Sequence, residues 1–419
     1  MSHFPSSFFR ATCLLLCLLS VPARGQEWTR FRGPNGSGLS PATTIPVQWS
    51  EKDHNWKVHL PGVGHSSPVL WGERIFLTSA EEQTGKRFVH CLRTTDGSRV
   101  WLREFEGQQH RKHEDNSFAS ATPAVDEKRV YVCWATPKEY IVLALDHDGK
   151  EVWRIDLGPY KSGHGFGASP IVHEDQVIVA NDQDGQSTLV ALDRDTGKVR
   201  WKVPRKSKSS YSTPCVFRPK GRAAELIFTS YEHGITGIDP KTGQKTWELD
   251  VFSKGHVETP IGSPIVAGDL VLGVSGWLGV KKEVVAVRPG LPGQEEKREQ
   301  VYRIDRAAPL CTTPLVKDDL LFLWSDEGMV TCANALTGEL HWRERVPGTY
   351  YGSPVCAGKH LYCISRDGDV VVLAAKKQFE QTARNSLGEG SHSTPAIAGG
   401  RMYLRTFTHL ISIGGKERQ

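Results

Sequence analysis

Short runs of aliphatic and β-branched residues, separated by polar turns, follow one another along almost the whole chain. Residues 171–180, IVHEDQVIVA, break at a charged turn, residues 187–193, STLVALD, follow a polar loop, and residues 198–203 form a last run. This pattern predicts four short strands joined by tight turns, with Gly where a turn needs positive φ. No long stretch has the 3.6-residue periodicity of an amphipathic helix.

A Ser-Pro or Thr-Pro pair opens the first apolar run of each such unit, and the pair recurs at intervals of roughly 40 to 55 residues. Pro at the first position of an innermost strand removes no hydrogen bond from the sheet. Three further pairs, at Pro41, Pro137 and Pro260, are out of step. The pairs in phase end at Pro68, Pro123, Pro170, Pro214, Pro264, Pro314, Pro354 and Pro395.

A second repeated feature supports the first, because a turn containing Gly precedes a Trp by a fixed offset in five units. Asp148-Gly149 leads to Trp153 and Thr196-Gly197 leads to Trp201, for example. A Trp on the outermost strand is large enough to bury itself against the adjoining sheet. The predicted structural tryptophans of the sheets are Trp56, Trp101, Trp153, Trp201, Trp247 and Trp342.

Four-stranded units repeated in this way predict an all-β fold, an eight-bladed β-propeller of antiparallel blades. The last unit, from Pro395 to about Ile413, has room for only three strands. We expect the N-terminal strand around Trp56 to supply the fourth and to close the ring. A seven-bladed alternative would leave one in-phase Pro unexplained.

The first residues are typical of an export signal rather than of the propeller. Arg10 precedes the apolar residues 11–21, and Ala23 and Gly25 are small residues suited to cleavage. We predict a signal peptide at 1–25, with cleavage after Ala23 as the alternative, and one propeller domain at 26–419. The protein is then exported, periplasmic or extracellular, and this apolar stretch is too short to span a membrane. Whether Cys17 carries a lipid anchor stays open.

Charge and cysteine content exclude two classes of protein. The chain has 52 basic and 47 acidic residues, and loss of Arg10 and Arg24 with the leader leaves a net charge of about +3, too small to indicate nucleic-acid binding. Seven of the nine cysteines remain, an odd number scattered over strands, which is not a disulfide framework. Cys356 and Cys363 are the one pair that we expect on adjoining strands of one blade, within reach of a disulfide.

The repeat, with Ala191-Leu192-Asp193 leading to Thr196-Gly197-Lys198 and Trp201, resembles the pyrroloquinoline-quinone (PQQ)-type propeller repeat. That family includes quinoprotein alcohol dehydrogenases and a non-catalytic propeller of the outer-membrane assembly machinery. The resemblance covers nearly the whole mature chain and implies the fold more firmly than the function. Residues 28–38, WTRFRGPNGSG, are similar to the start of many secreted bacterial members.

The catalytic branch of this family implies features that the chain lacks. Those enzymes are longer, hold the quinone over a Trp floor beneath two adjacent cysteines, and use calcium with an Asp base. No Cys-Cys pair occurs here and no calcium-ligand set aligns. We therefore expect no cofactor, with PQQ and calcium as the alternative because some relatives lack the paired cysteines.

In a propeller of this topology, the residues before each Ser/Thr-Pro pair and the hairpins between second and third strands share one face. These residues would line a funnel mouth in which Trp277 or Trp324 offers a stacking surface and Arg366 an anion contact. The interpretation that we put first is that these are ordinary polar residues around a water-filled channel, and the ligand pocket is the alternative. The candidate ligand-binding residues are His65, His164, Tyr211, Asp182, Glu258, Trp277, Trp324, Asp326, Tyr351, Arg366, Asp367 and His392.

Other motifs carry less weight. The charged loop from His110 to Asp115 holds two histidines but no third metal ligand at a nearby spacing, so we expect a solvated loop and no metal site. Phosphate loops, Gly-x-Ser-x-Gly elbows and His-Glu-x-x-His helices are absent from the sequence.

Three functions remain, in this order. The first is an exported, monomeric, non-catalytic scaffold that binds protein partners or a small polar ligand. The second is a PQQ-dependent alcohol or sugar dehydrogenase, the one enzyme class that we retain. The third is a carbohydrate-binding propeller.

Overall fold

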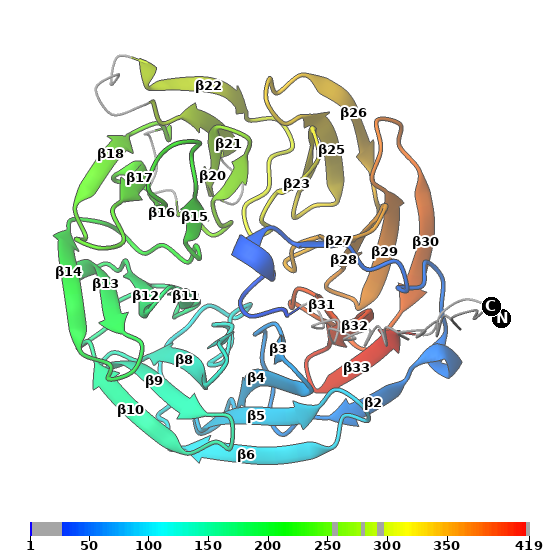
Figure 1. Ribbon diagram of the computed structural model, residues 1–419, viewed down its shortest axis with the longest axis horizontal. Helices are drawn as coiled ribbons and strands as arrows, with labels where there is room; N and C mark the ends of the chain where they lie inside the picture. The colour runs from blue at the N-terminus through cyan, green and yellow to red at the C-terminus, as the bar shows by residue number, and fades with distance from the viewer. Residues whose placement is uncertain (2–26, 254–258, 278–280, 291–296, 416–419) are drawn as a thin grey trace.

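A computed structural model of the chain describes residues 1, 27–253, 259–277, 281–290 and 297–415. Almost all of the predicted signal peptide and Glu258 lie outside the described residues. Eight sheets are arranged radially around one axis (Figure 1). Seven have four strands, and one has a fifth strand from the N-terminal segment. The predicted all-β, eight-bladed propeller is confirmed.

In the first seven blades the strands run in chain order from the axis to the rim, and each neighbouring pair is antiparallel. Blade 1 comprises β3 (Val69–Trp71), β4 (Arg74–Ala80), β5 (Arg87–Arg93) and β6 (Arg99–Phe105); blade 2 comprises β7 (Ala124–Val125), β8 (Arg129–Ala135), β9 (Tyr140–Asp146) and β10 (Glu151–Asp156). Blade 3 comprises β11 (Ile171–His173), β12 (Gln176–Asn181), β13 (Ser187–Asp193) and β14 (Val199–Arg205); blade 4 comprises β15 (Cys215–Phe217), β16 (Glu225–Ser230), β17 (Gly234–Ile238) and β18 (Lys245–Leu249). Blade 5 comprises β19 (Ile265–Ala267), β20 (Leu270–Gly276), β21 (Lys282–Arg288) and β22 (Glu299–Ile304); blade 6 comprises β23 (Leu315–Lys317), β24 (Leu320–Trp324), β25 (Met329–Asn334) and β26 (Leu340–Arg345). Blade 7 comprises β27 (Val355–Ala357), β28 (His360–Ile364), β29 (Asp369–Ala374) and β30 (Gln381–Ser386).

The eighth blade joins the two ends of the chain. Its inner strands are β31 (Ala396–Ala398), β32 (Arg401–Arg405) and β33 (His409–Gly414), and its outermost strand is the N-terminal β2 (Trp56–His59). Strand β2 pairs antiparallel with β33, with Trp56 opposite Ser412. The expected closure by the N-terminal strand is confirmed.

Burial follows the position of each strand in its blade. Strands β12 and β21 lie between neighbouring sheets and are almost wholly buried, which explains why they appear in the sequence as continuous apolar runs. The rim strands are mostly exposed. In β10 the one fully buried position is that of Trp153.

The rim tryptophans join successive blades through one repeated contact. The indole N–H of Trp101 donates to the carbonyl of His147 at 2.7 Å, and that of Trp153 donates to Arg194 at 3.0 Å, in each case in the next blade. The ring packs on the turn glycine of that blade: a Cβ built on Gly197, which has φ +71°, would lie 2.7 Å from the Trp153 ring. The turn therefore needs Gly both for its backbone conformation and for this close approach.

Three units depart from this contact. In blade 7, the rim strand β30 contains no Trp. In blade 5, Tyr302 replaces Trp, and its hydroxyl donates to Ala335 at 2.7 Å above Gly338 of blade 6. In blade 4, the indole of Trp247 donates instead to the Glu225 carboxylate of its own blade at 2.8 Å.

The N-terminal segment 28–40 crosses the axis and carries a short 3-10 helix, η1 (Pro34–Gly36) (Figure 1). We call it the axial segment. Trp28 pairs with Leu70 of blade 1, the Val125 N–H of blade 2 donates to Thr29, and β1 (Leu39–Ser40) pairs parallel with β27. A second 3-10 turn, η2 (Glu51–Asp53), leads into β2.

Two buried guanidinium groups fix the axial segment to further blades. Arg30 donates to the carbonyl of Pro214 at 2.5 Å, and Arg32 donates to those of Pro314 and Pro354 at 2.8 and 3.0 Å. Burial lowers the pKa of Arg30 to about 10 and that of Arg32 to about 9. The acceptors are the repeat prolines of blades 4, 6 and 7, so the segment binds five blades in all.

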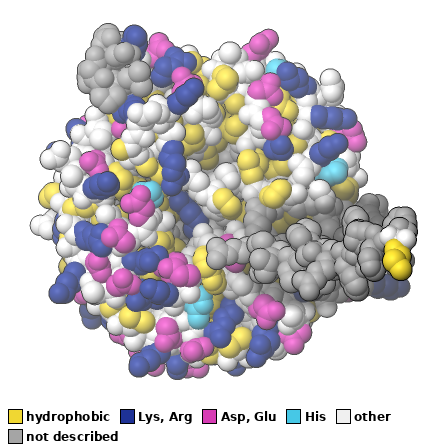
Figure 2. Space-filling model, viewed as in Figure 1, with side chains coloured by type: hydrophobic (Ala, Val, Ile, Leu, Met, Phe, Trp, Pro, Cys, Tyr) yellow, Lys and Arg dark blue, Asp and Glu magenta, His cyan; other side chains and the backbone are white. Residues whose placement is uncertain are grey.

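The face that carries η1 has no single-sign charge field. Figure 2 shows Lys and Arg side chains interspersed with Asp and Glu around its rim.

All seven described cysteines are free, and six are buried. In blade 7, Cys356 lies opposite Leu361 and Cys363 lies opposite Val371. The disulfide considered for this pair does not form, because the register keeps the two thiols apart.

We predict that Trp153→Ala lowers the free energy of unfolding by about 3–5 kcal/mol, because it removes the packing on Gly197 and leaves a cavity between two blades. Urea unfolding measures this loss. Trp277→Ala is the matched control, since Trp277 is 37% exposed and should change the stability little. Equal effects of the two substitutions would contradict the proposed contact.

Candidate functional site

A cavity of about 430 Å³ lies on the propeller axis. Phe31 of the axial segment contributes to it from one side, and His113, Asp115 and Asn116, from the long connection between β6 and β7, contribute from the other. The cavity is therefore bounded by the axial segment and by the β6–β7 connection, and between them it is lined by the inner ends of all eight blades.

The middle of the cavity is a ring of eight hydroxyl groups. They belong to the residues that precede the repeat prolines, and Ser and Thr alternate around the ring: Ser67, Thr122, Ser169, Thr213, Ser263, Thr313, Ser353 and Thr394. At seven joints, the backbone N–H of one ring residue donates to the hydroxyl of the next blade at 2.9 to 3.2 Å. The Thr394 N–H donates to Ser67 and so links the last blade to the first.

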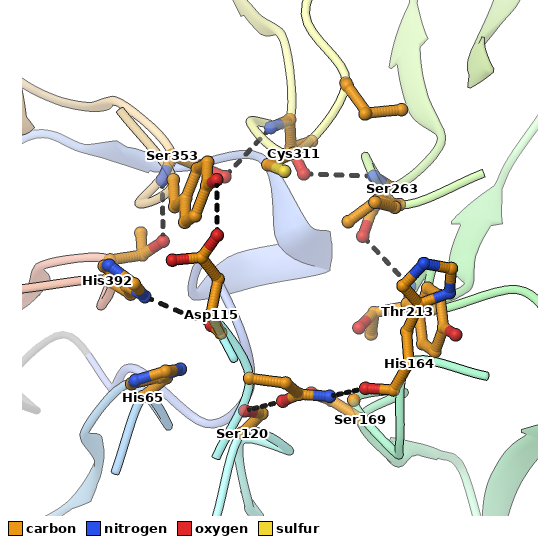
Figure 3. Close-up of a pocket in the computed structure, with 18 of the residues that line it drawn as sticks. His65, Asp115, Ser120, His164, Ser169, Thr213, Ser263, Cys311, Ser353 and His392 are labelled. Carbon is orange, nitrogen blue, oxygen red and sulfur yellow. Dashed lines mark hydrogen bonds between the residues drawn. The ribbon is translucent and has the colours of Figure 1, made fainter. Parts of the chain in front are cut away.

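Four imidazoles line the cavity in two pairs. Figure 3 shows His65 beside His392, and His164 across the cavity from them. The rings of His65 and His392 have centroids 4.5 Å apart, and those of His113 and His164 are 5.3 Å apart. Burial holds the pKa of His65 well below its ordinary value, and burial together with Arg366 lowers that of His392 to about 4. Burial also lowers the pKa of His164. These three rings are neutral at pH 7.

Asp115 is the one carboxylate among the described lining residues, and its oxygens are engaged inside the protein. It forms an ion pair with Arg366, and the Tyr351 hydroxyl donates to it at 3.1 Å. Arg366 also donates to His392 Nε2 at 3.2 Å, which leaves the hydrogen on Nδ1 for the Asp115 carbonyl at 3.3 Å. This network fastens the β6–β7 connection to blade 7 across the cavity.

The remaining wall is aromatic. Trp277 meets His164 edge to face with centroids 5.6 Å apart, and Tyr211 shares a hydrogen bond of 2.7 Å with Ser162. Cys311 lies nearby, and burial raises the pKa of its thiol well above the ordinary value. The protonated thiol is a poor nucleophile.

The structure brings half of the candidate ligand-binding residues into the cavity lining. These are His65, His164, Tyr211, Trp277, Tyr351 and His392. Arg366 lies immediately behind them, in contact with three lining residues. Asp367 is exposed outside the lining.

Three candidates were placed wrongly by the topological argument. Trp324 is completely buried between blades and offers no stacking surface. Asp182 is buried in an ion pair with Arg205. Asp326 is buried behind the wall, where it accepts the backbone N–H groups of Leu310 and Cys311 at 2.8 Å. Hairpin residues near the axis can point between blades as easily as into the channel.

Sequence reasoning missed the hydroxyl ring, Phe31 and the β6–β7 connection. The ring residues were interpreted only as marks of the repeat, although a hydroxyl at the same place in eight inner strands is itself a signal. The charged loop was expected to be solvated, yet His113 and Asp115 line the cavity. Its contact with Arg366 spans 251 positions in the sequence and has no local signature.

The lining does not fit a calcium-bound quinone. Among the described lining residues, the one carboxylate is paired with Arg366 and Tyr351, and neither lysine nor arginine is present. Within the described part of the chain, no group of three or more His, Cys, Asp or Glu residues is arranged to hold a metal ion.

Comparison with known proteins begins with the sequence. The profile of the family described as "Outer membrane protein assembly factor BamB" matches residues 138–295 and 294–416. The chain belongs to this family of PQQ-like propellers. It is 24% identical over 281 residues to outer membrane protein assembly factor BamB of Moranella endobia, which covers 61% of this chain and 66% of that protein.

A second relative is much longer than the aligned region. The β-alanine-activating enzyme of Drosophila melanogaster is 24% identical over 263 residues, 57% of this chain but only 24% of that protein. The aligned regions thus span less than two thirds of both of these relatives.

Solved structures show the same fold at low identity. BamB from Moraxella catarrhalis superposes with a TM-score of 0.62 at 16% identity, covering 87% of this chain and 97% of that one. A europium-containing methanol dehydrogenase superposes with a TM-score of 0.68 at 12% sequence identity, and the alignment covers 90% of this chain and 89% of that one. The quinohemoprotein alcohol dehydrogenase of Comamonas testosteroni superposes with a TM-score of 0.67 at 13% sequence identity, and the alignment covers 95% of this chain and 82% of that one. Such identities show the fold and leave the function to the site.

Because these buried imidazoles are neutral, we predict that the stability of the folded protein decreases at acidic pH. The pKa of His392 is about 4 in the folded protein and near 6.5 in the unfolded chain, so the unfolded chain binds more protons between these values. The free energy of unfolding should therefore fall as the pH drops from about 6.5 to about 4. Urea titrations should give a shallower fall for His392→Gln, and an identical pH dependence would argue against a buried neutral ring.

Proposed function

We propose that this protein is an exported, non-catalytic scaffold that binds a protein partner in outer-membrane assembly. The observation that carries the proposal is the internal pairing of the cavity's one described carboxylate, Asp115, with Arg366 and Tyr351. An aspartate that acts as the base of a quinone-dependent dehydrogenase must be free to take a proton, and this one is held by a cation and a hydroxyl. The family match and the BamB relatives support the same function.

The shape of the molecule suits this role. The axial segment binds five blades, so the propeller is a rigid disc with the axial channel closed on that side. The connections on the opposite side, including the exposed Asp367, vary in length and sequence from blade to blade. Described residues contain no helix long and apolar enough to cross a membrane. Export itself rests on the predicted leader, and we propose a single propeller domain for residues 26–419.

Site-specific photo-crosslinking in a bacterial envelope tests the partner. We expect a crosslinker at Asp367, on the side of the β6–β7 connection, to yield one defined protein adduct. A crosslinker at Thr242, in an exposed turn of the opposite side, should yield none. Both variants must be exported and folded equally. Adducts from neither position, or the same adducts from both, would oppose the proposal.

The quinone-dependent dehydrogenase is the alternative, and the carbohydrate-binding propeller is the further one. The alternative has in its favour only the fold that it shares with the solved dehydrogenases. We predict that the mature protein, given PQQ and calcium, does not reduce an artificial electron-acceptor dye with primary alcohols or sugars. A quinoprotein alcohol dehydrogenase assayed in parallel is the positive control, and turnover above the protein-free rate would restore the alternative.

A further inference from the structure

The hydroxyl ring presents a set of hydrogen-bond donors to the axis. Each of seven hydroxyls already accepts one backbone N–H, and a hydroxyl keeps one hydrogen to donate after it has accepted. Among the described residues, no acceptor is recorded for any of the eight ring hydroxyls. Up to eight O–H donors are therefore available around one small space.

Positive charge exceeds negative charge around this space. Arg30 and Arg32 donate to the carbonyls of Pro214, Pro314 and Pro354, each directly after a ring residue, so both guanidinium groups lie just below the ring. Both are fully buried, both remain protonated at pH 7, and no carboxylate partner is recorded for either in the described part of the chain. Charges inside a protein are screened far less than charges in water.

Among the described lining residues, no free negative charge compensates these two cations. Asp115, the carboxylate of the lining, is neutralised by Arg366. The rings of His65, His164 and His392 carry no charge at pH 7. The cavity thus combines convergent hydroxyl donors with two unpaired cations beneath them, and this combination favours a negatively charged oxygen group.

From this arrangement we infer that the axial cavity binds a small organic anion, with its carboxylate or phosphate oxygens on the hydroxyl ring. The volume of about 430 Å³ accommodates a compact molecule such as a six-carbon acid or sugar phosphate. Trp277 offers its exposed ring to the carbon skeleton. A neutral sugar would gain the hydroxyl contacts but nothing from the two guanidinium groups. This site is independent of a protein partner on the loops.

A matched set of three probes tests the role of charge: glucose, glucuronate and glucose 6-phosphate, each titrated into the mature full-length protein by calorimetry. At least one anionic probe should bind ten or more times tighter than glucose, and its affinity should fall as salt rises. Equal affinity for glucose would overturn the inference in favour of a neutral-sugar site. Failure of both anions to bind would overturn it outright.

Variants of one ring residue locate the site. Thr313→Val keeps the shape but removes the hydroxyl, and should weaken binding of the tighter anion at least tenfold, whereas Thr313→Ser should retain it. Thr242→Val, in an exposed turn of another blade, is the control. Thr313 accepts the Ser263 N–H, so unfolding curves must first show that Thr313→Val is folded. A folded Thr313→Val that binds as well as Thr313→Ser would exclude the ring.

Arg32→Gln provides a second, independent variant. Glutamine retains donors for the proline carbonyls but removes the charge beneath the ring. We expect it to reduce anion affinity several-fold without creating affinity for glucose, and unchanged anion affinity would contradict the electrostatic part of the inference. Photo-crosslinking to a protein partner does not depend on this cavity, so failure of the anion site and failure of the scaffold function are distinguishable.

Discussion

The fold depends on one hydrogen bond repeated around the axis, from the backbone N–H at the start of an innermost strand to the hydroxyl of the next blade. Each bond fixes the angle between two neighbouring sheets at the point where they are closest. The bond from Thr394 to Ser67 joins the two ends of this series. At the rim, the indole of one blade packs on the turn glycine of the next blade and so joins the same two neighbours a second time. Most neighbouring blades are thus held at both the axis and the rim.

The axial segment adds a constraint of a different kind, because it binds blades that are not neighbours. Arg30 contacts blade 4, and Arg32 contacts blades 6 and 7. A buried guanidinium without a carboxylate is costly, and the carbonyl groups of the prolines offset only part of that cost. The positive charge of the two guanidinium groups therefore stays uncompensated next to the axis. One stretch of sequence therefore serves both the rigidity of the disc and the chemistry of its cavity.

The sequence was sufficient for the architecture because the repeat records local contacts. Pro170, Gly197 and Trp201 each have a role within one blade or at one joint, and eight approximate copies make that role visible. The eight-bladed count and the closure by β2 followed from these copies. The cavity was only partly predictable, because its contents come from segments outside the repeat. The contacts of Asp115 with Arg366 and of Arg30 with Pro214 join positions whose separation in sequence carries no pattern.

The closure of the eighth blade by β2 also determines when this chain can fold. Strand β2 pairs with β33, which lies more than 300 residues later, and the axial segment needs blades 6 and 7 before Arg32 has partners. Contacts of such long range slow folding, and the blades made first must wait for the last. A polypeptide that emerges from a translocation pore in order, N-terminus first, would thus remain incomplete until its final strand has crossed. Under the export that we propose, assembly of the disc would then be coupled to the end of transport.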